Sequence, residues 1–208
     1  MSASEVPVAA VAARSERNPR IVLLRHGQTE WSELGKHTGR TDIPLTELGA
    51  EQARRVAPTI AALGLRTPLV VTSPRLRAHR TASLAGLRVN RTWDALAEWD
   101  YGTYEGLTTP EIRESVPDWT VWTHPCPGGE SAEAVHARCD LVLSVARSQL
   151  AERDVVLVGH GHFSRALVSR WLELPVLEGR RFALSAAGMS VLGFERGTQQ
   201  VISHNIAS

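Results

Sequence analysis

The stretch "IVLLRHGQTEW" spans residues 21–31 and sets a run of four aliphatic residues directly against Arg25, His26 and Gly27. Such a run, closed by polar residues and a glycine, is typical of a buried β-strand that ends at a turn. Arginine and histidine can both carry positive charge, and like charges repel each other. Their placement side by side is explained if an anion normally lies between them. The end of this strand therefore predicts an anion-binding site.

The composition indicates that this anion site is local. The chain has 208 residues, of which 43% are hydrophobic and 22% charged, and its net charge is +1. These values are ordinary for a globular protein, and the length suits one large α/β domain. A net charge so close to zero gives no general attraction to nucleic acid or to an acidic membrane surface. We therefore expect neither a nucleic acid nor a membrane as partner.

The N-terminal segment and the two cysteines favour a cytoplasmic protein. Residues 1–18 contain a short apolar run, "VPVAAVAA", with no basic residue before it, whereas a secretory signal needs a basic start and a longer apolar stretch. Cys126 and Cys139 have neither zinc-site nor disulfide-scaffold spacing, so we expect reduced thiols. We interpret residues 1–18 as a flexible tail and residues 19–208 as a single domain.

Apolar runs alternate with helical patterns along the rest of the chain, which predicts an α/β fold. Pro58 lies inside one helical pattern and should kink or split it. Thr109 and Pro110 are suited to the N-cap and first position of another helix. The expected order is a strand at 20–24, a helix at 46–63, a strand at 68–73, a helix at 74–84, a strand at 87–92, helices from 109 and over 131–150, a strand at 154–160, a helix to about 174, and a hairpin at 189–205. This order predicts a three-layer α/β/α sandwich with a mostly parallel sheet and helices on both faces.

Polar side chains follow four of the expected strands. Arg25 and His26 end the first, Arg77 follows the second, Glu98 follows the third, and His160 ends the strand that begins at Asp154. Ligands of such sheets bind beyond the carboxyl ends of the strands. We therefore expect these residues to converge on one pocket.

This set of side chains is suited to phosphoryl transfer. Arginine forks bind phosphate oxygens, and an imidazole can attack phosphorus to form a phosphohistidine. A carboxylic acid protonates the leaving oxygen, while a second histidine and the backbone of a glycine-rich turn, here Gly161, stabilise the phosphate oxygens. The arginines supply the countercharge, so the chemistry requires no metal or other cofactor. They should also lower the pKa of His26 and keep it neutral, and Gly27 should leave room for the phosphate.

The chain contains four motifs in order over residues 20 to about 170: "LLRHGQTEWS", "TSPRLRAHRTA", "EWDYGTYEG" and "VGHGHFSR". Together, and in this order, they resemble the motifs of the histidine phosphatase superfamily, also called phosphoglycerate mutase-like. The resemblance implies that His26 is the nucleophile, that Arg25, Arg77 and His160 form the phosphate pocket with it, and that Glu98 is the proton donor. It also places Thr29, Ser32 and Thr38 at further polar contacts. Ser32 departs from the family, where asparagine is common, and the shorter serine reaches less far.

Within the superfamily, the sequence favours a phosphatase that acts on small phosphorylated metabolites, sugar phosphates among them. The mutases usually carry a longer insertion after the acid block, but only about twenty residues separate "YEG" (104–106) from "PGGES" (127–131). A phosphoglycerate mutase-type isomerase and a non-catalytic phosphate-binding module stay open as alternatives. The expected partner is a small phosphomonoester, and a homodimer is compatible with the sequence.

Several assignments have rivals nearby in the sequence. Asp100 competes with Glu98 as the acid, and Arg75 competes with Arg77 in the phosphate pocket. The "HGH" at 160–162 could be a pair of metal ligands, but no further ligand is evident, so we expect His162 to face the pocket entrance and help select the substrate. The remaining histidines, His37, His79, His124, His136 and His204, are expected to be ordinary surface or hydrogen-bonded residues.

Overall fold

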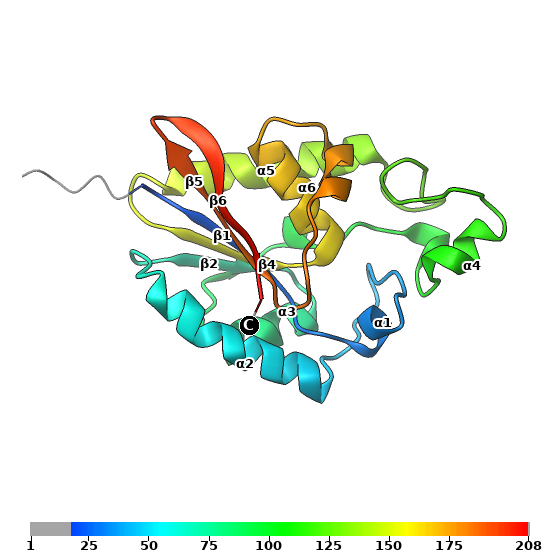
Figure 1. The fold of residues 1–208 in the computed structure, drawn as a ribbon, viewed down its shortest axis with the longest axis horizontal. Helices are drawn as coiled ribbons and strands as arrows, with labels where there is room; N and C mark the ends of the chain where they lie inside the picture. The colour runs from blue at the N-terminus through cyan, green and yellow to red at the C-terminus, as the bar shows by residue number, and fades with distance from the viewer. Residues whose placement is uncertain (1–17, 208) are drawn as a thin grey trace, which may run out of the picture.

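A six-stranded sheet lies between two layers of helices (Figure 1) in the computed structural model, which describes residues 18–207. The strand order is β3-β2-β4-β1-β5-β6, with the first four strands parallel and the last two antiparallel to their neighbours. The predicted α/β/α sandwich with a mostly parallel sheet is therefore confirmed. The predicted tail falls almost wholly on residues 1–17, outside the described part. The strands are β1 (Ile21–Arg25), β2 (Leu69–Thr72), β3 (Arg91–Thr92), β4 (Val155–Gly159), β5 (Met189–Glu195) and β6 (Thr198–Ile206).

The helices divide between the two faces of the sheet. In Figure 1, α2 and α3 cover one face, and α5 and α6 cover the other. None of the described helices is both long and apolar enough to cross a membrane. The α-helices are α1 (Glu30–Glu33), α2 (Glu47–Ala62), α3 (Leu76–Leu84), α4 (Thr109–Arg113), α5 (Ala132–Gln149) and α6 (Gly161–Trp171), and the 3-10 helices are η1 (Asp94–Leu96), η2 (Gly102–Tyr104) and η3 (Val176–Arg181).

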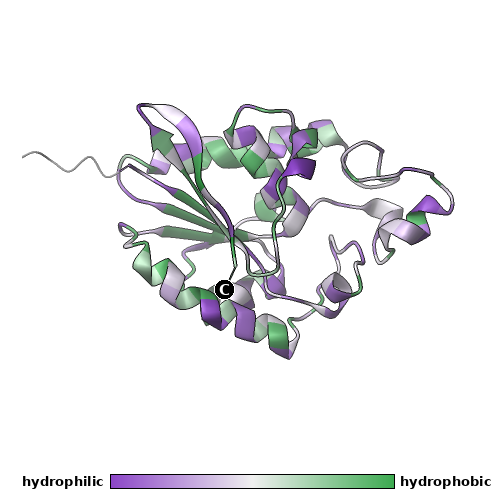
Figure 2. Ribbon diagram, in the orientation of Figure 1, coloured by the Kyte–Doolittle hydropathy of each residue, from purple (hydrophilic) through white to green (hydrophobic). Residues whose placement is uncertain are grey.

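The two central strands are covered by helices on both faces, which explains their unbroken aliphatic sequences. Along β1, Val22 and Leu24 pack toward α2 and α3, while Ile21 and Leu23 pack toward α5 and α6. Figure 2 shows the resulting hydrophobic band along the middle of the sheet. Burial of each such side chain contributes about 1.5–3 kcal/mol. The two packed faces hold the end of β1, and with it Arg25 and His26, in one place.

Helix α2 is continuous although Pro58 lies inside it, so the expected split does not occur. Proline cannot donate the hydrogen bond to the carbonyl four residues earlier. Both Pro58 and Arg54, which carries that carbonyl, lie on the exposed side of the helix. Water can therefore satisfy the carbonyl that proline leaves free.

Two other elements begin or end differently from expectation. Helix α4 is capped by Thr108, one residue before the predicted N-cap, because Glu111 reaches back to the Thr108 N–H and completes a capping box. Strand β3 covers only Arg91–Thr92. Just before it, the side chain of Asn90 accepts a hydrogen bond from Val70 N–H at 2.8 Å, so a side chain replaces the strand's backbone there.

The C-terminal hairpin forms as predicted, with its turn at Arg196 and Gly197. Both residues have positive φ, +52° and +84°, as a two-residue hairpin turn of the primed type requires. Strand β5 pairs antiparallel with β1, from Ile21↔Leu192 to Leu24↔Met189. The hairpin therefore seals the side of β1 that faces away from β4.

Candidate active site

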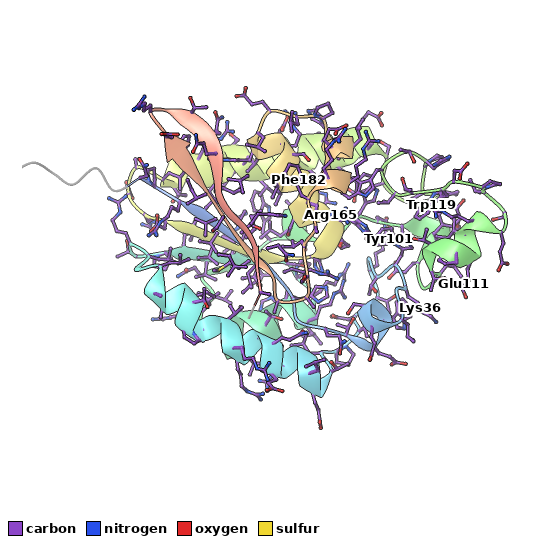
Figure 3. All side chains as sticks on the ribbon, in the orientation of Figure 1. Lys36, Tyr101, Glu111, Trp119, Arg165 and Phe182 are labelled. Carbon is purple, nitrogen blue, oxygen red and sulfur yellow. The ribbon has the colours of Figure 1, made fainter. Side chains whose placement is uncertain are left out.

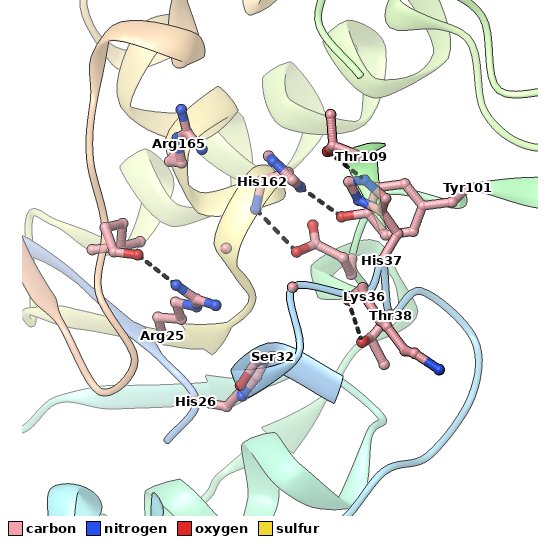
Figure 4. Close-up of a pocket in the computed structure, with 14 residues that line it drawn as sticks. Arg25, His26, Ser32, Lys36, His37, Thr38, Tyr101, Thr109, His162 and Arg165 are labelled. Atoms are coloured by element: carbon pink, nitrogen blue, oxygen red, sulfur yellow. Dashed lines mark hydrogen bonds between the residues drawn. The ribbon is translucent and has the colours of Figure 1, made fainter. Parts of the chain in front are cut away.

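A cavity of about 270 Å³ opens beyond the carboxyl ends of the parallel strands, as the strand-end rule predicts. Side chains from the loop after α1, from the segment that follows η1 and from α6 approach it from different sides (Figures 3 and 4). Its volume is at the small end for ligand pockets, so it suits a small substrate. The lining residues are Arg25, His26, Ser32, Gly35, Lys36, His37, Thr38, Glu98, Tyr101, Thr109, Gly161, His162, Arg165 and Leu184.

The backbone and side chain of His26 are both fixed. Its N–H donates to the Gly159 carbonyl at 2.9 Å, and its carbonyl accepts from Ala187 N–H at 3.0 Å. The ring nitrogen Nδ1 lies 2.7 Å from the Gly27 carbonyl. A carbonyl oxygen can only accept, so Nδ1 must carry the proton and donate it. The other nitrogen, Nε2, then has a free electron pair.

The pKa of His26 lies well below its ordinary value of 6.5, chiefly because the ring is buried and then because Arg25 and Arg77 are close. The hydrogen bond to Gly27 acts in the opposite direction and is outweighed. We expected the arginines to cause this shift, but burial is the larger cause. The result is a neutral imidazole in a positively charged site, which is the form a nucleophile needs.

Gly27 is required by a backbone contact that was not expected, and the expected room for a phosphate beside it stays a prediction. A Cβ atom built on it would lie 2.2 Å from the carbonyl oxygen of Gly49 in α2. The glycine is needed because the turn after β1 packs against the first turns of α2. Its position is therefore explained by this close approach of two backbones, without reference to a phosphate.

Arg25 is a partly buried cation with few partners. Its Nη1 donates to the Leu184 carbonyl at 2.6 Å, while its Nε is buried and has no hydrogen-bond partner in the described structure. No ion pair joins it to any carboxylate among residues 18–207. Gly161 packs on it, since a Cβ there would lie 3.3 Å from Arg25 Nε. A partly buried charge left in this state favours binding of an anion.

His160 lies beside His26, with 5.2 Å between the ring centroids. Arg77 Nε donates to His160 Nδ1 at 3.3 Å, so Nδ1 is the unprotonated nitrogen. His160 Nε2 must then carry the proton and donate it to Ser73 Oγ at 2.6 Å. Burial, followed by the charge of Arg77, lowers the pKa of His160 well below 6.5. His160 is therefore neutral and held in one tautomer.

Arg77 is fully buried and does not line the cavity. Besides His160, its guanidinium donates to the backbone carbonyls of Thr41 at 2.8 Å, Thr38 at 3.1 Å and Gly39 at 3.2 Å. Asp42 lies 4.0 Å away and is its nearest carboxylate partner. The structure thus places Arg77 behind the two histidines, where it adds positive charge. The predicted contact with phosphate stays a prediction.

Glu98 lines the cavity beside the first turn of α6. Its Oε1 accepts from the backbone N–H groups of Trp99 and Phe163, both at 2.8 Å, and its Oε2 accepts from His162 N–H at 3.0 Å. A carboxylate has about four acceptor positions. Three are filled by backbone, so the one that remains is on Oε2.

The rivals of these residues make other contacts. Asp100 pairs with Arg40 at 2.6 Å and accepts from Gly102 N–H at 3.1 Å, and it does not line the cavity. Arg75 lies outside the cavity lining as well. Across residues 18–207, no three His, Cys, Asp or Glu side chains are grouped as a metal site would require.

The residues predicted to make further contacts with the substrate fall into two groups, those that line the cavity and one that does not. Ser32, Thr38, Gly161 and His162 line the cavity, whereas Thr29 is fully buried and caps α1 through its hydroxyl. The Ser32 hydroxyl in turn donates to the Thr29 carbonyl at 2.9 Å. Contact of any of them with a substrate stays a prediction.

One wall of the cavity was missed by sequence reasoning. His37, which we expected to be an ordinary histidine, is 8% exposed and lines the cavity, and burial lowers its pKa to about 4. Its Nε2 lies 3.2 Å from the hydroxyl of Thr109, and its ring packs on Tyr101. The Tyr101 hydroxyl lies 2.7 Å from Nδ1 of His162. The quoted motif "EWDYGTYEG" contains Tyr101, but no sequence pattern links it to the distant His37.

Comparison with known proteins adds three findings. A sequence profile described as histidine phosphatase superfamily (branch 1) matches residues 21–207. An acid phosphatase of Mycobacterium tuberculosis is 53% identical over 185 residues, which cover 89% of this chain and 91% of that protein. A sedoheptulose 1,7-bisphosphatase of Saccharomyces cerevisiae is 34% identical over 190 residues, with 76% and 69% covered.

Solved structures agree with this likeness. The solved structure of the protein encoded by an open reading frame of Mycobacterium tuberculosis superposes on this chain with a TM-score of 0.90. The two are 51% identical, and the match covers 92% of this chain and 99% of that protein. The curated relatives also include 2,3-bisphosphoglycerate-dependent phosphoglycerate mutases.

Proposed function

The chain belongs to the histidine phosphatase superfamily and is a phosphatase, and on that premise we propose that it hydrolyses small phosphomonoesters through a phosphohistidine on His26. The observation that carries the proposal is the neutral, buried His26, whose Nε2 is unprotonated, beside Arg25, whose charge has no carboxylate partner in the described structure. A nucleophile and an anion-binding cation thus lie at the end of one strand.

The first step transfers the phosphoryl group to the protein. Arg25 binds the phosphate oxygens, together with the N–H of Gly161, which as the first residue of α6 has no partner within the helix. His160 is fully buried outside the cavity lining, so its protonated Nε2 donates to phosphate only after giving up its hydrogen bond to Ser73. Nε2 of His26 attacks phosphorus, and the bond from phosphorus to the ester oxygen breaks. The leaving oxygen takes a proton from Glu98, whose remaining open position is on Oε2. Arg77 contributes positive charge from behind the histidines.

The second step releases phosphate. A water molecule attacks the phosphohistidine and gives its proton to Glu98, which is now a carboxylate. The phosphorus–nitrogen bond breaks, and its electron pair returns to Nε2. In this proposal His26 supplies the nucleophile, Glu98 the acid and base, and Arg25 the countercharge.

The expected substrates are small and include sugar phosphates. The cavity of about 270 Å³ supports a small leaving group. The sedoheptulose 1,7-bisphosphatase among the relatives acts on a sugar phosphate, which supports the same class here.

Phosphate release from a chromogenic phosphomonoester and from a panel of sugar phosphates tests the proposal. His26→Ala should lower turnover about 10⁴-fold or more, since removal of a covalent nucleophile has effects of this size. Wild-type protein should also yield a phosphorylated form that is stable to alkali and labile to acid, as a phosphohistidine is. Activity of His26→Ala above about a hundredth of wild type would contradict the covalent route.

Activity should be greatest at mildly acidic pH. The first step needs Glu98 as an acid and the second step needs it as a base, so we expect an optimum and not a rate that rises steadily with pH. His26 must be neutral, and its lowered pKa keeps it so well below pH 6.5. A rate that still rises above about pH 9 would count against Glu98 as the acid. Extensive chelation should leave the rate unchanged.

The mutase alternative is favoured by the phosphoglycerate mutases among the relatives. A mutase would need a bisphosphate primer and would transfer the phosphoryl group between positions of its substrate. Incubation with a phosphoglycerate, with and without bisphosphate, separates the two activities because only the phosphatase releases inorganic phosphate.

A further inference from the structure

The loop at residues 38–41 lies between two oppositely charged side chains. On one side, the guanidinium of Arg77 donates to the carbonyls of Thr38, Gly39 and Thr41. On the other side, the carboxylate of Glu105 accepts from backbone N–H groups, at 2.6 Å from Thr41 and at 3.1 Å from Arg40. The same short stretch of backbone thus gives its N–H groups to one residue and its carbonyls to the other.

The chemistry of the two side chains makes this arrangement directional. A carboxylate can only accept hydrogen bonds, and a guanidinium can only donate them. Burial would raise the pKa of Glu105, but the hydrogen bonds from the backbones of Thr41, Arg40 and Gly39 outweigh it and lower that pKa. Glu105 therefore holds the loop as an anion, and the peptide groups point their oxygens toward Arg77.

Arg77 passes this constraint to the active site. Its Nε donates to Nδ1 of His160, which leaves Nε2 protonated and turned to Ser73. If the loop carbonyls moved, the guanidinium would lose the three acceptors that orient it. His160 would then lose the donor that selects its tautomer.

We propose that Glu105 is a positioning residue of the phosphatase: through the backbone of residues 39–41 it orients Arg77, and through Arg77 it sets the tautomer of His160. Glu105 does not line the cavity and touches none of the reacting groups. This inference rests on the proposed function, because it assigns His160 a part in phosphate binding. It adds a residue that acts through three successive sets of hydrogen bonds: from the loop to Glu105, from Arg77 to the loop, and from Arg77 to His160.

Glu105→Gln tests the proposal, with Asp154→Asn as its matched control. The glutamine keeps the size of the side chain but replaces one acceptor oxygen by a donor amide that faces a backbone N–H. Asp154 is likewise a carboxylate that accepts from two backbone N–H groups, of Arg20 at 3.0 Å and Arg66 at 2.8 Å, but it lies at the amino end of β4. Each variant weakens the hydrogen bonds that hold a segment of backbone in place. Only the segment held by Glu105 is hydrogen-bonded to Arg77.

We expect Glu105→Gln to lower kcat about 10- to 100-fold, as misplacement of catalytic groups does, and to weaken inhibition by inorganic phosphate. In NMR spectra of the ring nitrogens, which need no turnover, wild-type His160 should show the single neutral tautomer with Nε2 protonated. The variant should show a mixture of tautomers or a protonated ring. Asp154→Asn should keep kcat within about twofold and keep the wild-type His160 signals, although it unfolds more easily.

A Glu105→Gln variant with kcat within about twofold of wild type, or with unchanged His160 signals, would overturn the proposal. If this variant fails to fold, Glu105→Asp keeps the charge and shortens the reach, and it should show a smaller change in the same two measurements. The proposed function is tested by a different result: it is wrong if the wild-type protein releases no phosphate. In that case the NMR spectra still show whether Glu105 sets the tautomer of His160.

Discussion

The amino and carboxyl ends of the parallel strands differ in how their charged side chains are satisfied. At the amino end, Asp154 is 4% exposed, accepts two backbone N–H groups and forms an ion pair with Arg20 at 3.0 Å. At the carboxyl end, Arg25 has one carbonyl partner and a buried Nε without any in the described structure. At the amino end the opposite charges pair with each other and stabilise the fold. At the carboxyl end the charge of Arg25 has no carboxylate partner in the described structure and is available to a ligand. The difference predicts opposite effects of mutation at the two ends.

The largest effect is expected at the carboxyl end. Arg25→Met should lower kcat/KM about 10²- to 10³-fold, because it removes the cation that we propose binds the phosphate. Stability should stay the same or increase, since replacement of a charge inside the protein by an apolar side chain of similar volume is often neutral or stabilising, and Arg25 is partly buried. Steady-state kinetics and urea unfolding measure the two effects. A loss of stability without a loss of activity would reverse the comparison.

Asp154→Asn should have the opposite profile. Removal of the carboxylate leaves Arg20 and two backbone N–H groups poorly paired, and we expect the free energy of unfolding to fall by about 3 kcal/mol. Activity at a temperature where the variant is folded should match wild type. Urea unfolding with the chromogenic assay checks both, and Arg25→Met serves as the control with the reverse outcome.

The two ends should also respond differently to pH, because four histidines with lowered pKa values belong to the carboxyl end: His26, His37, His160 and His162. Below pH 6.5 these histidines take up protons in the unfolded chain but stay neutral in the folded protein, because their pKa values are lower there. Protonation therefore favours the unfolded chain, and the free energy of unfolding falls as pH falls. For His37 the window runs from 6.5 down to about 4. Each such histidine contributes about 1.4 kcal/mol per pH unit to the slope.

Urea unfolding of wild type and His37→Asn between about pH 7 and about pH 5 checks this effect. The variant should have the shallower dependence on pH, whatever its stability at pH 7, because it lacks one group that protonates only in the unfolded chain. Equal slopes would show that His37 takes up its proton in the folded protein as well.

A smaller effect is expected from Gly161→Ala. The added Cβ would lie 3.3 Å from Arg25 Nε, so the guanidinium must shift by a few tenths of an ångström. We expect kcat/KM to fall about 10-fold, since small displacements of binding groups are costly. Stability should change by less than about 0.5 kcal/mol. Unchanged kinetics would mean that Arg25 is not confined by the first turn of α6.

The sequence predicted those parts of the molecule that depend on short stretches of chain. The aliphatic run before Arg25 specified a strand buried on both faces, and the strand-end rule brought His26, Glu98 and the cavity to one edge. Boundaries depended on single side chains, such as Asn90 replacing backbone in β3 and Glu111 completing the cap of α4. Such contacts are not visible in hydrophobic periodicity.

The rest of the site depends on contacts between distant segments. Nothing in the sequence pairs Glu105 with the backbone of residue 41, or Tyr101 with His162. The contact between Ser73 and His160 could have been predicted. Ser73 follows β2 in the same motif as Arg77, His160 follows β4, and the ends of parallel strands meet at one edge of the sheet. His37 gave no signal of its own, since it becomes a cavity residue only when its loop packs against residues 106 and 107.

The strand order has a consequence for synthesis of the chain. Strand β1, which leads directly into the proposed nucleophile His26, is made early, but its two neighbours are β4 and β5, which begin at Val155 and Met189. Until these strands leave the ribosome, the edges of an aliphatic strand stay unpaired, and such edges invite association with other chains. The growing polypeptide carries His26 long before it can be a phosphatase. The active site can be complete only after the C-terminal hairpin has paired with β1.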